Sequence, residues 1–454
     1  MQTFKENLAS HTVALQSEAL PQTFRDAIMI TKTLGLNYLW IDSLCIIQDD
    51  KLDWQREASR MALIYENAQF AIAASWGSNG EAGCFHAYIP SLSIELRAHQ
   101  DLVDNTTQPG VQIYIRSCRD DKKYLTEAAL NNRGWALQEM LLSPRTISFG
   151  EDQMHWTCAS LYDSEDGFDY DSSVLPHSSP SRGTILSYES DDTNDVDWRS
   201  PIQSSECWTF TVHGYSYRQL SYARDKLAAL AGVTQAHQRI FGDEPLVGLW
   251  RHNISRGLLW QTYPSTHSCL DTEAIEALNI PSWSWLKMKG EVKTKEHGSE
   301  SLLSIQDSTL IWEGLPMTSR IVEASITGRG KLFWVLGMEK RSGEERCMCS
   351  VKGLDLQCSP GLGPSFTIPV YWYCDQCGFL VPFPDNLYCL LVYNDVLSGP
   401  RGRSVSHMEI SGLIVTPDSN GSSVSKYCRI GMVNFESFPR DAFECSTEQD
   451  FILV

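Results

Sequence analysis

The sequence predicts an α/β domain with a mainly parallel sheet, followed by a β-rich α+β unit. Between about residues 20 and 158, apolar patterns of helical spacing alternate with short apolar runs typical of buried strands. After about residue 205, one helical segment precedes runs rich in Trp, Val, Ile and turn residues, such as KLFWVLG and YCLLVY. A chain of 454 residues is also long enough for two domains.

The first 75 residues predict two helices and two strands. The first helix is indicated by apolar residues at helical spacing and by a glycine stop, namely Phe24, Ala27, Ile28, Leu34 and Gly35. The apolar run 38–41 is typical of a strand buried on both faces. The second helix is capped by Asp49 or Asp50 and has an inner face of Trp54, Ala58, Met61 and Tyr65. Residues 70–74 predict another buried strand.

Further elements are predicted between residues 111 and 158. Strands are expected at 111–115, 146–149 and 153–158, and a helix over 135–142 ends where Pro144 restricts the residue before it. In the last strand, apolar and polar residues alternate as in a half-buried strand: Met154, Trp156 and Cys158 against Gln153, His155 and Thr157. Strands that alternate with helices imply a mainly parallel sheet with right-handed crossovers.

The composition changes at residue 161. Residues 161–204 are rich in Asp, Ser and Glu and poor in large aliphatic residues, which predicts an acidic linker between residues 1–160 and 205–454. Beyond the linker, residues 219–237 read as one helix centred on DKLAALAGV, before the β-rich remainder.

Charge and cysteine usage exclude several classes of protein. A net charge of −19 without a basic run disfavours nucleic acid as a partner. The polar N-terminus lacks a secretory signal, and no stretch approaches the roughly 18 apolar residues that span a membrane. Fourteen cysteines scattered through a long chain indicate thiols in a reducing compartment. We therefore expect a cytoplasmic protein that binds neither membranes nor nucleic acid.

Three segments resemble the fungal heterokaryon-incompatibility (HET) domain family. The first is LPQTFRDAIMITKTLGLNYLWIDSLCIIQDD at 20–50 with its continuation DWQREASRMALIYENAQFAIAAS, and the second is RGWALQEMLLSPRTISFGEDQMHWTC at 133–158. A looser likeness to the region behind that domain follows in YSYRQLSYARDKLAALAGV, GLWRHNISRGLLWQ, PSWSW and YCRIG. The resemblance implies a flavodoxin/TIR-like sheet. It also implies a role in non-self recognition and programmed cell death, with protein partners and a possible homo-oligomer.

The sequence departs from the family pattern at its beginning. HET domains usually start with a strand of the type Y-x-x-L-S-Y-x-W-G, and FKENL resembles what normally follows it. The likeness is therefore to a HET domain without its first strand motif. A misplaced start codon, an inactive paralogue and replacement by another segment are the open explanations.

Trp135 and Glu139 form the sharpest candidate for chemistry. They lie four residues apart on a predicted helix, so the indole and the carboxylate share a face. HET domains resemble TIR domains in element order, and TIR enzymes that cleave NAD use a glutamate at this spacing from a tryptophan. The resemblance implies that Glu139 stabilises the ribosyl cation and that Trp135 lines the pocket, with NAD as substrate and no resident cofactor. The alternative is a surface glutamate beside a core tryptophan.

The remaining binding candidates are Asp42, Ser43, Arg133 and Gln138. Asp42 follows the run 38–41 and is expected at the carboxyl end of a parallel strand, where ligands bind in open α/β sheets. The alternative is an aspartate that satisfies loop amides. Arg133 could hold a phosphate or a carboxylate, or form a surface ion pair. Cys45, in an apolar run, is expected to be a packed thiol.

Other motifs favour structure over chemistry. Cys374 and Cys377 lack a second ligand pair of zinc-ribbon spacing, so no metal site is predicted. Four tryptophans are expected in the core because aromatic side chains dominate packing: Trp250, Trp260, Trp283 and Trp285. No P-loop, GxSxG or HExxH motif occurs. A cell-death protein with possible NAD cleavage is therefore preferred, and a non-catalytic signalling module or an inactive paralogue is the alternative.

Overall fold

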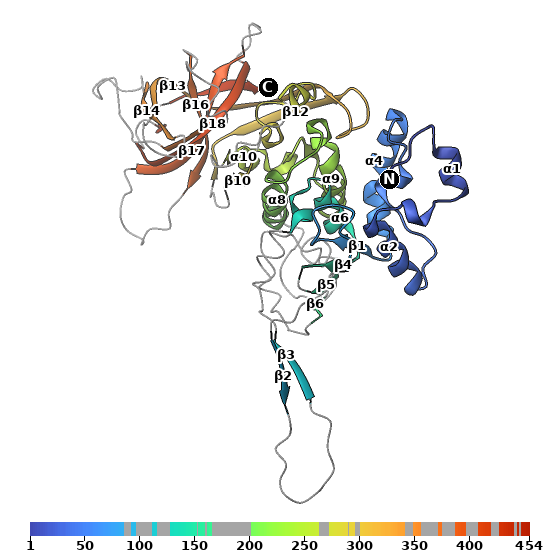
Figure 1. Ribbon diagram of the computed structural model, residues 1–454. Helices are drawn as coiled ribbons and strands as arrows, with labels where there is room; N and C mark the ends of the chain where they lie inside the picture. The colour runs from blue at the N-terminus through green and yellow to red at the C-terminus, as the bar shows by residue number, and fades with distance from the viewer. Residues whose placement is uncertain are drawn as a thin grey trace, which may run out of the picture. The chain divides into compact units, whose positions relative to one another are not determined.

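The computed structural model describes most of the chain (Figure 1). The described residues are 1–85, 92–96, 111–115, 128–151, 153–158, 161–165, 201–262, 272–288, 290–295, 300–340, 348–355, 371–374, 386–395, 407–418, 426–439, 443–444 and 446–454. Two compact units divide the chain: residues 1–54, 67–132 and 143–179 form the first, and residues 55–66, 133–142 and 180–454 the second. Most of the predicted acidic linker, residues 166–200, lies outside the described part.

Short helices and two small sheets make up the first unit. Its helical elements are α1 (Leu8–Val13), η1 (Ser17–Ala19), α2 (Gln22–Thr33), α3 (Asp42–Cys45), η2 (Ala129–Asn132) and the start of α4 (Lys51–Asn67). Its strands are β1 (Ala71–Ala74), β2 (Leu92–Leu96), β3 (Val111–Ile115), β4 (Arg145–Phe149), β5 (Met154–Cys158) and β6 (Tyr162–Ser164).

The two predicted N-terminal helices are confirmed as α2 and α4. Helix α2 ends before Gly35, whose φ of 71° is the left-handed conformation that glycine adopts without strain. At the start of α4, a side-chain oxygen of Asp50 accepts the N–H groups of Leu52 and Asp53 at 3.0 and 3.2 Å. Asp50, rather than Asp49, therefore satisfies the first free amides of α4.

The predicted strand at 38–41 is absent. These residues belong to no strand, and Tyr38 has 93% of its surface exposed. A strand is stable only when a neighbour takes its backbone N–H and C=O groups. No described strand pairs with this run, so it leads as an extended segment into α3, which begins at Asp42.

The sheet β1-β4-β5-β6 is mixed, which corrects the prediction of a mainly parallel sheet. Only β1 and β4 run parallel, pairing Ala71 with Thr146, whereas β4–β5 and β5–β6 are antiparallel. Because only residues 150–153 separate β4 from β5, the chain has room for a hairpin but not for a crossover of about a dozen residues.

In the segment that contains β5, the predicted alternation is present only at the start, where the polar residues are the buried ones, whereas residues 156–158 are all partly buried. His155 and Gln153 are buried, whereas Met154 is 37% exposed. The Tyr162 hydroxyl lies 2.9 Å from Nδ1 of His155, so the buried imidazole has a hydrogen-bond partner. Burial of His155 is therefore compatible with the general pairing of buried polar groups.

The second unit begins with a helical layer. Its helical elements are residues 55–66 of α4, α6 (Ala136–Leu142), α8 (Pro201–Ser216), η5 (Ala223–Lys226), α9 (Ala228–Phe241), η6 (Arg251–Asn253), α10 (Ile254–Gly257), α11 (Thr272–Glu276) and η7 (Trp285–Lys287). Helix α6 confirms the helix predicted over 135–142.

The single helix predicted over 219–237 is wrong at its start. Tyr222 is extended, with φ −126° and ψ 120°, then η5 forms, and α9 runs on to Phe241. The side chains of two buried η5 residues form hydrogen bonds with distant segments. Asp225 accepts from the Trp135 indole, and Lys226 donates to the carbonyl of Met288. These contacts override the helical propensity of the segment.

The β-rich remainder is confirmed. Its strands are β7 (Pro245–Leu246), β8 (Leu249–Trp250), β9 (Trp260–Thr262), β10 (Val292–Thr294), β11 (Glu300–Ser301), β12 (Ser304–Trp312), β13 (Ile321–Lys340), β14 (Met348–Asp355), β15 (Tyr371–Cys374), β16 (Tyr388–Asp395), β17 (His407–Pro417), β18 (Lys426–Pro439) and β19 (Glu448–Leu453). Nine of them form one sheet in the order β11-β16-β17-β18-β15-β14-β13-β12, with β19 paired to β13 and β18. The helices pack on this sheet through one large apolar cluster, from Leu137 of α6 to Phe451 of β19.

None of the helices in the described part of the chain combines the length and the apolar content needed to cross a bilayer.

An aromatic cluster surrounds His237 of α9. The ring centroid of His237 lies 4.4 Å from those of Phe241 and Trp250 and 5.2 Å from that of Trp208. Burial among these rings lowers the pKa of His237 from 6.5 to about 3, because the apolar surroundings penalise the imidazolium. His237 is therefore neutral in the folded protein at physiological pH.

We predict that His237→Phe makes folding less sensitive to acid. The unfolded chain protonates this histidine below pH 6.5 and the folded chain only near pH 3, so wild-type stability falls as the pH decreases between these values. Between pH 7.5 and 5.5 the wild type should lose about 1.4 kcal/mol more free energy of unfolding than the variant. Urea denaturation at both pH values measures this difference, and equal losses would contradict the assignment.

Candidate functional site

The start of α6 is fixed by a close backbone contact. The N–H of Gly134 donates to the carbonyl of Gln219 at 2.7 Å, and Arg133 forms an isolated parallel bridge with the same residue. A Cβ at position 134 would lie 2.4 Å from a methyl carbon of Leu220. Glycine is therefore required here by the close approach of the 219–220 segment.

Gln138 lies inside the packing between α6 and α9. Its side chain is almost fully buried, and its Oε1 accepts the N–H of Gly232 at 3.3 Å. Its Nε2 lies 3.9 Å from the sulfur of Met61 in α4. The structure thus gives Gln138 a packing partner in each of the two neighbouring helices, and its predicted ligand contact stays a prediction.

Trp135 and Glu139 share one turn and are both partly exposed. The N–H of Glu139 donates to the Trp135 carbonyl at 3.5 Å, and the Trp135 indole donates to Oδ2 of Asp225 at 3.3 Å. The predicted common face is therefore present, with the nitrogen edge of the indole directed at a carboxylate.

Arg218 is a buried cation on which the charge of Glu139 acts. Its side chain is buried, with Nε donating to the Gly214 carbonyl at 2.8 Å and a terminal nitrogen donating to the Arg133 carbonyl at 3.2 Å. Burial lowers the pKa of Arg218, while Tyr217 and the negative charge of Glu139 raise it. The Glu139 carboxylate therefore helps to stabilise a buried cation.

Asp225 is a buried acid that the sequence did not single out. Desolvation raises the pKa of its carboxyl, and the hydrogen bond from Trp135 and the charge of Arg224 lower it in part. The run ARDKLAALAG offers a signal in retrospect, since three charged residues directly precede an apolar segment. The carboxyl of Asp225 thus contacts Trp135, and the charge of Glu139 acts on the buried guanidinium of Arg218.

Arg133 itself is exposed, and its carbonyl is bound by Arg218. An exposed side chain fits either predicted role, a bound anion or a surface ion pair, and the structure does not choose between them.

Asp42 and Ser43 lie in the first unit, whereas Glu139 lies in the second. Asp42 is exposed at the first position of α3, and its Oδ1 accepts the N–H of Ser43 at 2.7 Å. The expected place at the end of a strand is wrong because that strand does not form. The local hydrogen bond matches the alternative of an aspartate that satisfies loop amides. Cys45 is exposed, which corrects the expectation of a packed thiol.

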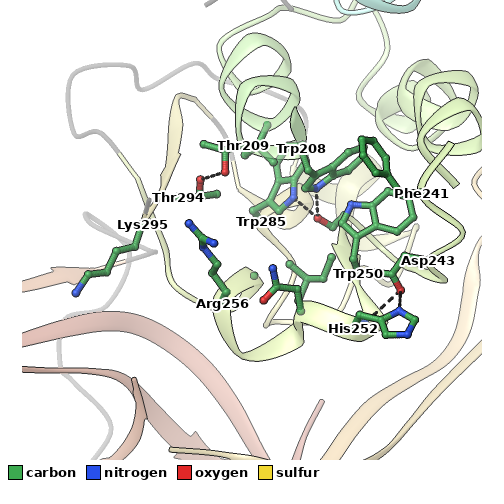
Figure 2. A pocket seen from close by; sticks show the side chains of 15 residues that line it. Trp208, Thr209, Phe241, Asp243, Trp250, His252, Arg256, Trp285, Thr294 and Lys295 are labelled. Carbon is green, nitrogen blue, oxygen red and sulfur yellow. Dashed lines mark hydrogen bonds and ion pairs between the residues drawn. The ribbon is translucent and has the colours of Figure 1, made fainter. Parts of the chain in front are cut away.

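A cavity in the second unit lies among tryptophans that the sequence assigned to the core (Figure 2). Trp250 and Trp285 are buried as predicted, but both also line this cavity of about 240 Å³. Trp260 and Trp283 are fully buried, and neither is among its lining residues. Sequence patterns missed the cavity because burial and cavity lining have the same apolar signature.

No cluster of three or more His, Cys, Asp or Glu side chains suited to a metal occurs among the residues that the structure describes. Cys377, one of the two cysteines considered for zinc, lies outside them.

Comparison with known families matches residues 1–139 to the family described as heterokaryon incompatibility protein (HET). No curated protein and no solved structure matches the chain. The mixed α/β architecture and the β-rich C-terminal region are therefore established without a structural relative, and a flavodoxin-like or TIR-like arrangement is supported by none.

We predict opposite stability effects for the two partners of the indole hydrogen bond. Trp135→Phe keeps the ring but removes the N–H that Asp225 accepts, and should cost about 1 kcal/mol of unfolding free energy at pH 7. Asp225→Asn removes the buried charge and keeps an acceptor. Because the folded pKa of Asp225 is raised, its contribution is fully present below pH 3.8 and is lost as the pH rises.

Urea denaturation at pH 4 and pH 7 tests both effects. Asp225→Asn should gain stability relative to the wild type as the pH rises. If the stability of Asp225→Asn relative to the wild type stays constant or falls between pH 4 and pH 7, the pKa of Asp225 is not raised in the folded protein.

Proposed function

Because the chain carries a heterokaryon incompatibility (HET) domain at residues 1–139, we propose that it acts in fungal vegetative incompatibility. In this role it takes part in non-self recognition in the cytoplasm and promotes programmed cell death through protein partners or through its own assembly. The family match to residues 1–139 is the observation that carries the proposal.

The contacts of α6 favour signalling through protein contacts over catalysis. A carboxylate that stabilises an oxocarbenium ion must have its negative charge available to the substrate. Glu139 instead acts on the buried guanidinium of Arg218, and the neighbouring indole donates to Asp225. In this arrangement both groups already serve the packing of the second unit.

NAD cleavage at Glu139 is the second candidate. It is favoured by the partial exposure of Trp135 and Glu139 on one helical turn, which leaves a face open to a ligand. For this reaction, the negative charge of Glu139 would have to stabilise a ribosyl cation in addition to the guanidinium of Arg218. Asp42, in the other unit, is not part of this proposal.

We predict that Glu139→Gln leaves cell killing within about twofold of the wild type, as a signalling role without NAD cleavage requires. The measurements are viability of fungal cells that overexpress each protein, and nicotinamide release by the purified full chain incubated with NAD. Glu276→Gln, an exposed glutamate in α11, is the matched control.

Each outcome selects one reading. Killing without nicotinamide release supports signalling by contacts. A loss of both by roughly 100-fold or more in Glu139→Gln alone, the size typical of a removed charge-stabilising group, would establish the catalytic candidate. Wild-type protein that kills no cells in any fungal background would contradict the proposed function.

A further inference from the structure

The cavity of the second unit is built by segments that are far apart in the sequence. Helix α8 contributes Trp208 and Thr209, the β7–β8 turn contributes Gly248, and Arg256 comes from α10. The volume of about 240 Å³ is below the roughly 300 to 1,000 Å³ of sites for drug-sized ligands. The cavity therefore suits a molecule smaller than a typical drug.

One carbonyl organises the aromatic wall. The oxygen of Gly248 accepts two indole N–H groups, from Trp208 at 2.8 Å and from Trp285 at 2.7 Å. Gly248 has φ 85°, and a Cβ there would lie 2.7 Å from Nε1 of Trp285. Since a carbonyl has two lone pairs, Gly248 cannot accept a third indole with good geometry.

Trp250 is that third indole. Its side chain is only 4% exposed, and its Nε1 finds no hydrogen-bond partner among the described residues. Figure 2 shows the nitrogen edge of its ring turned toward the side on which Trp208 and Trp285 lie. A buried donor without an acceptor is costly, so an acceptor atom in the cavity would be favoured here.

The polar lining places one positive charge opposite the indoles. In Figure 2 the guanidinium of Arg256 points toward Thr294 and Trp285. His252 and Lys295 also line the cavity; His252 binds Asp243 through Nδ1 at 2.7 Å, and Lys295 donates to the Ser411 hydroxyl at 2.5 Å. The guanidinium of Arg256, at the cavity wall and near the indoles, is a cation that a ligand carboxylate can contact.

We propose that this cavity binds a small flat heteroaromatic carboxylate. The ring lies against the indoles of Trp208 and Trp250, a ring nitrogen or carbonyl oxygen accepts the Trp250 N–H, and the carboxylate meets the Arg256 guanidinium. This site is separate from Glu139 and does not depend on the proposed function. A cavity that holds only water is the competing explanation.

Three matched probes test the proposal on the full wild-type chain by titration calorimetry. Quinoline-6-carboxylate has the ring, the acceptor and the anion. Naphthalene-2-carboxylate lacks the acceptor, and quinoline-6-carboxamide lacks the charge. We expect saturable one-to-one binding of the first probe, about fivefold weaker binding of the second and at least tenfold weaker binding of the third.

Paired variants locate the binding. Trp250→Phe removes the donor that has no partner, and Trp283→Phe is its control: that indole is equally buried and also without a partner among the described residues, but lies outside the cavity lining. Arg256→Gln removes the cation, and Arg251→Gln is its control. Arg251 lies five residues before Arg256, is exposed, and its Nε lies 2.7 Å from Glu244.

Affinity for quinoline-6-carboxylate should fall about fivefold in Trp250→Phe and at least tenfold in Arg256→Gln, and stay unchanged in both controls. Far-ultraviolet circular dichroism establishes that each variant is folded, and the comparison of probes on the wild type needs no variant. No saturable binding to the wild type would mean a water-filled cavity and would overturn the proposal. Equal losses in the controls would place binding elsewhere, with the same consequence.

Discussion

The arrangement of the second unit depends on the close contact between α6 and α9 at Gly232. A Cβ at this position would lie 2.7 Å from both Cβ of Ala62 and Oε1 of Gln138. Glycine costs about 1 kcal/mol relative to alanine inside a helix, and here it allows α9 to approach α4 and α6 closely. Gln138 completes the contact by accepting the Gly232 N–H. Trp135, whose indole donates to Asp225, lies on the same helix α6 as Gln138.

This contact means that the HET-matched residues do not form one compact unit. Residues 55–66 and 133–139 lie within the match to residues 1–139 but belong to the second unit. The helix that carries the candidate glutamate is stabilised by residues beyond the family match, among them Gly232 and Asp225.

Local signals were sufficient to predict α2, α4 and α6 from the sequence. Helical spacing, the Asp50 cap, the Gly35 stop and the restriction before Pro144 act within a few residues, so they can be read from the chain. Pairing direction and solvent exposure depend on distant partners. The run 38–41 was apolar enough for a strand but pairs with no described strand, and β5 buries His155, whose Nδ1 lies within hydrogen-bond distance of the Tyr162 hydroxyl. The predicted helix 219–237 broke where Asp225 and Lys226 found tertiary partners.

The candidate site was predictable in spacing but not in electrostatics. One helical turn between Trp135 and Glu139 follows from the sequence, whereas the influence of Arg218 comes from a residue 79 positions beyond Glu139. The negative charge of Glu139 favours the charged form of the buried Arg218 guanidinium, which also donates to two backbone carbonyls. The charge of Arg218 thus acts on the carboxylate that the catalytic candidate would offer to a substrate.

Helix α9 is the physical link between this cluster and the cavity. Gly232, which contacts α6, and His237, which packs on Trp208 and Trp250 of the cavity wall, lie five residues apart, a rise of about 7.5 Å. Most residues on this face of α9 are buried and closely packed. A displacement of the cavity wall would therefore also shift the side chains that pack against α9. The same helix, α9, therefore contacts both the wall of the cavity and helix α6, which carries Glu139.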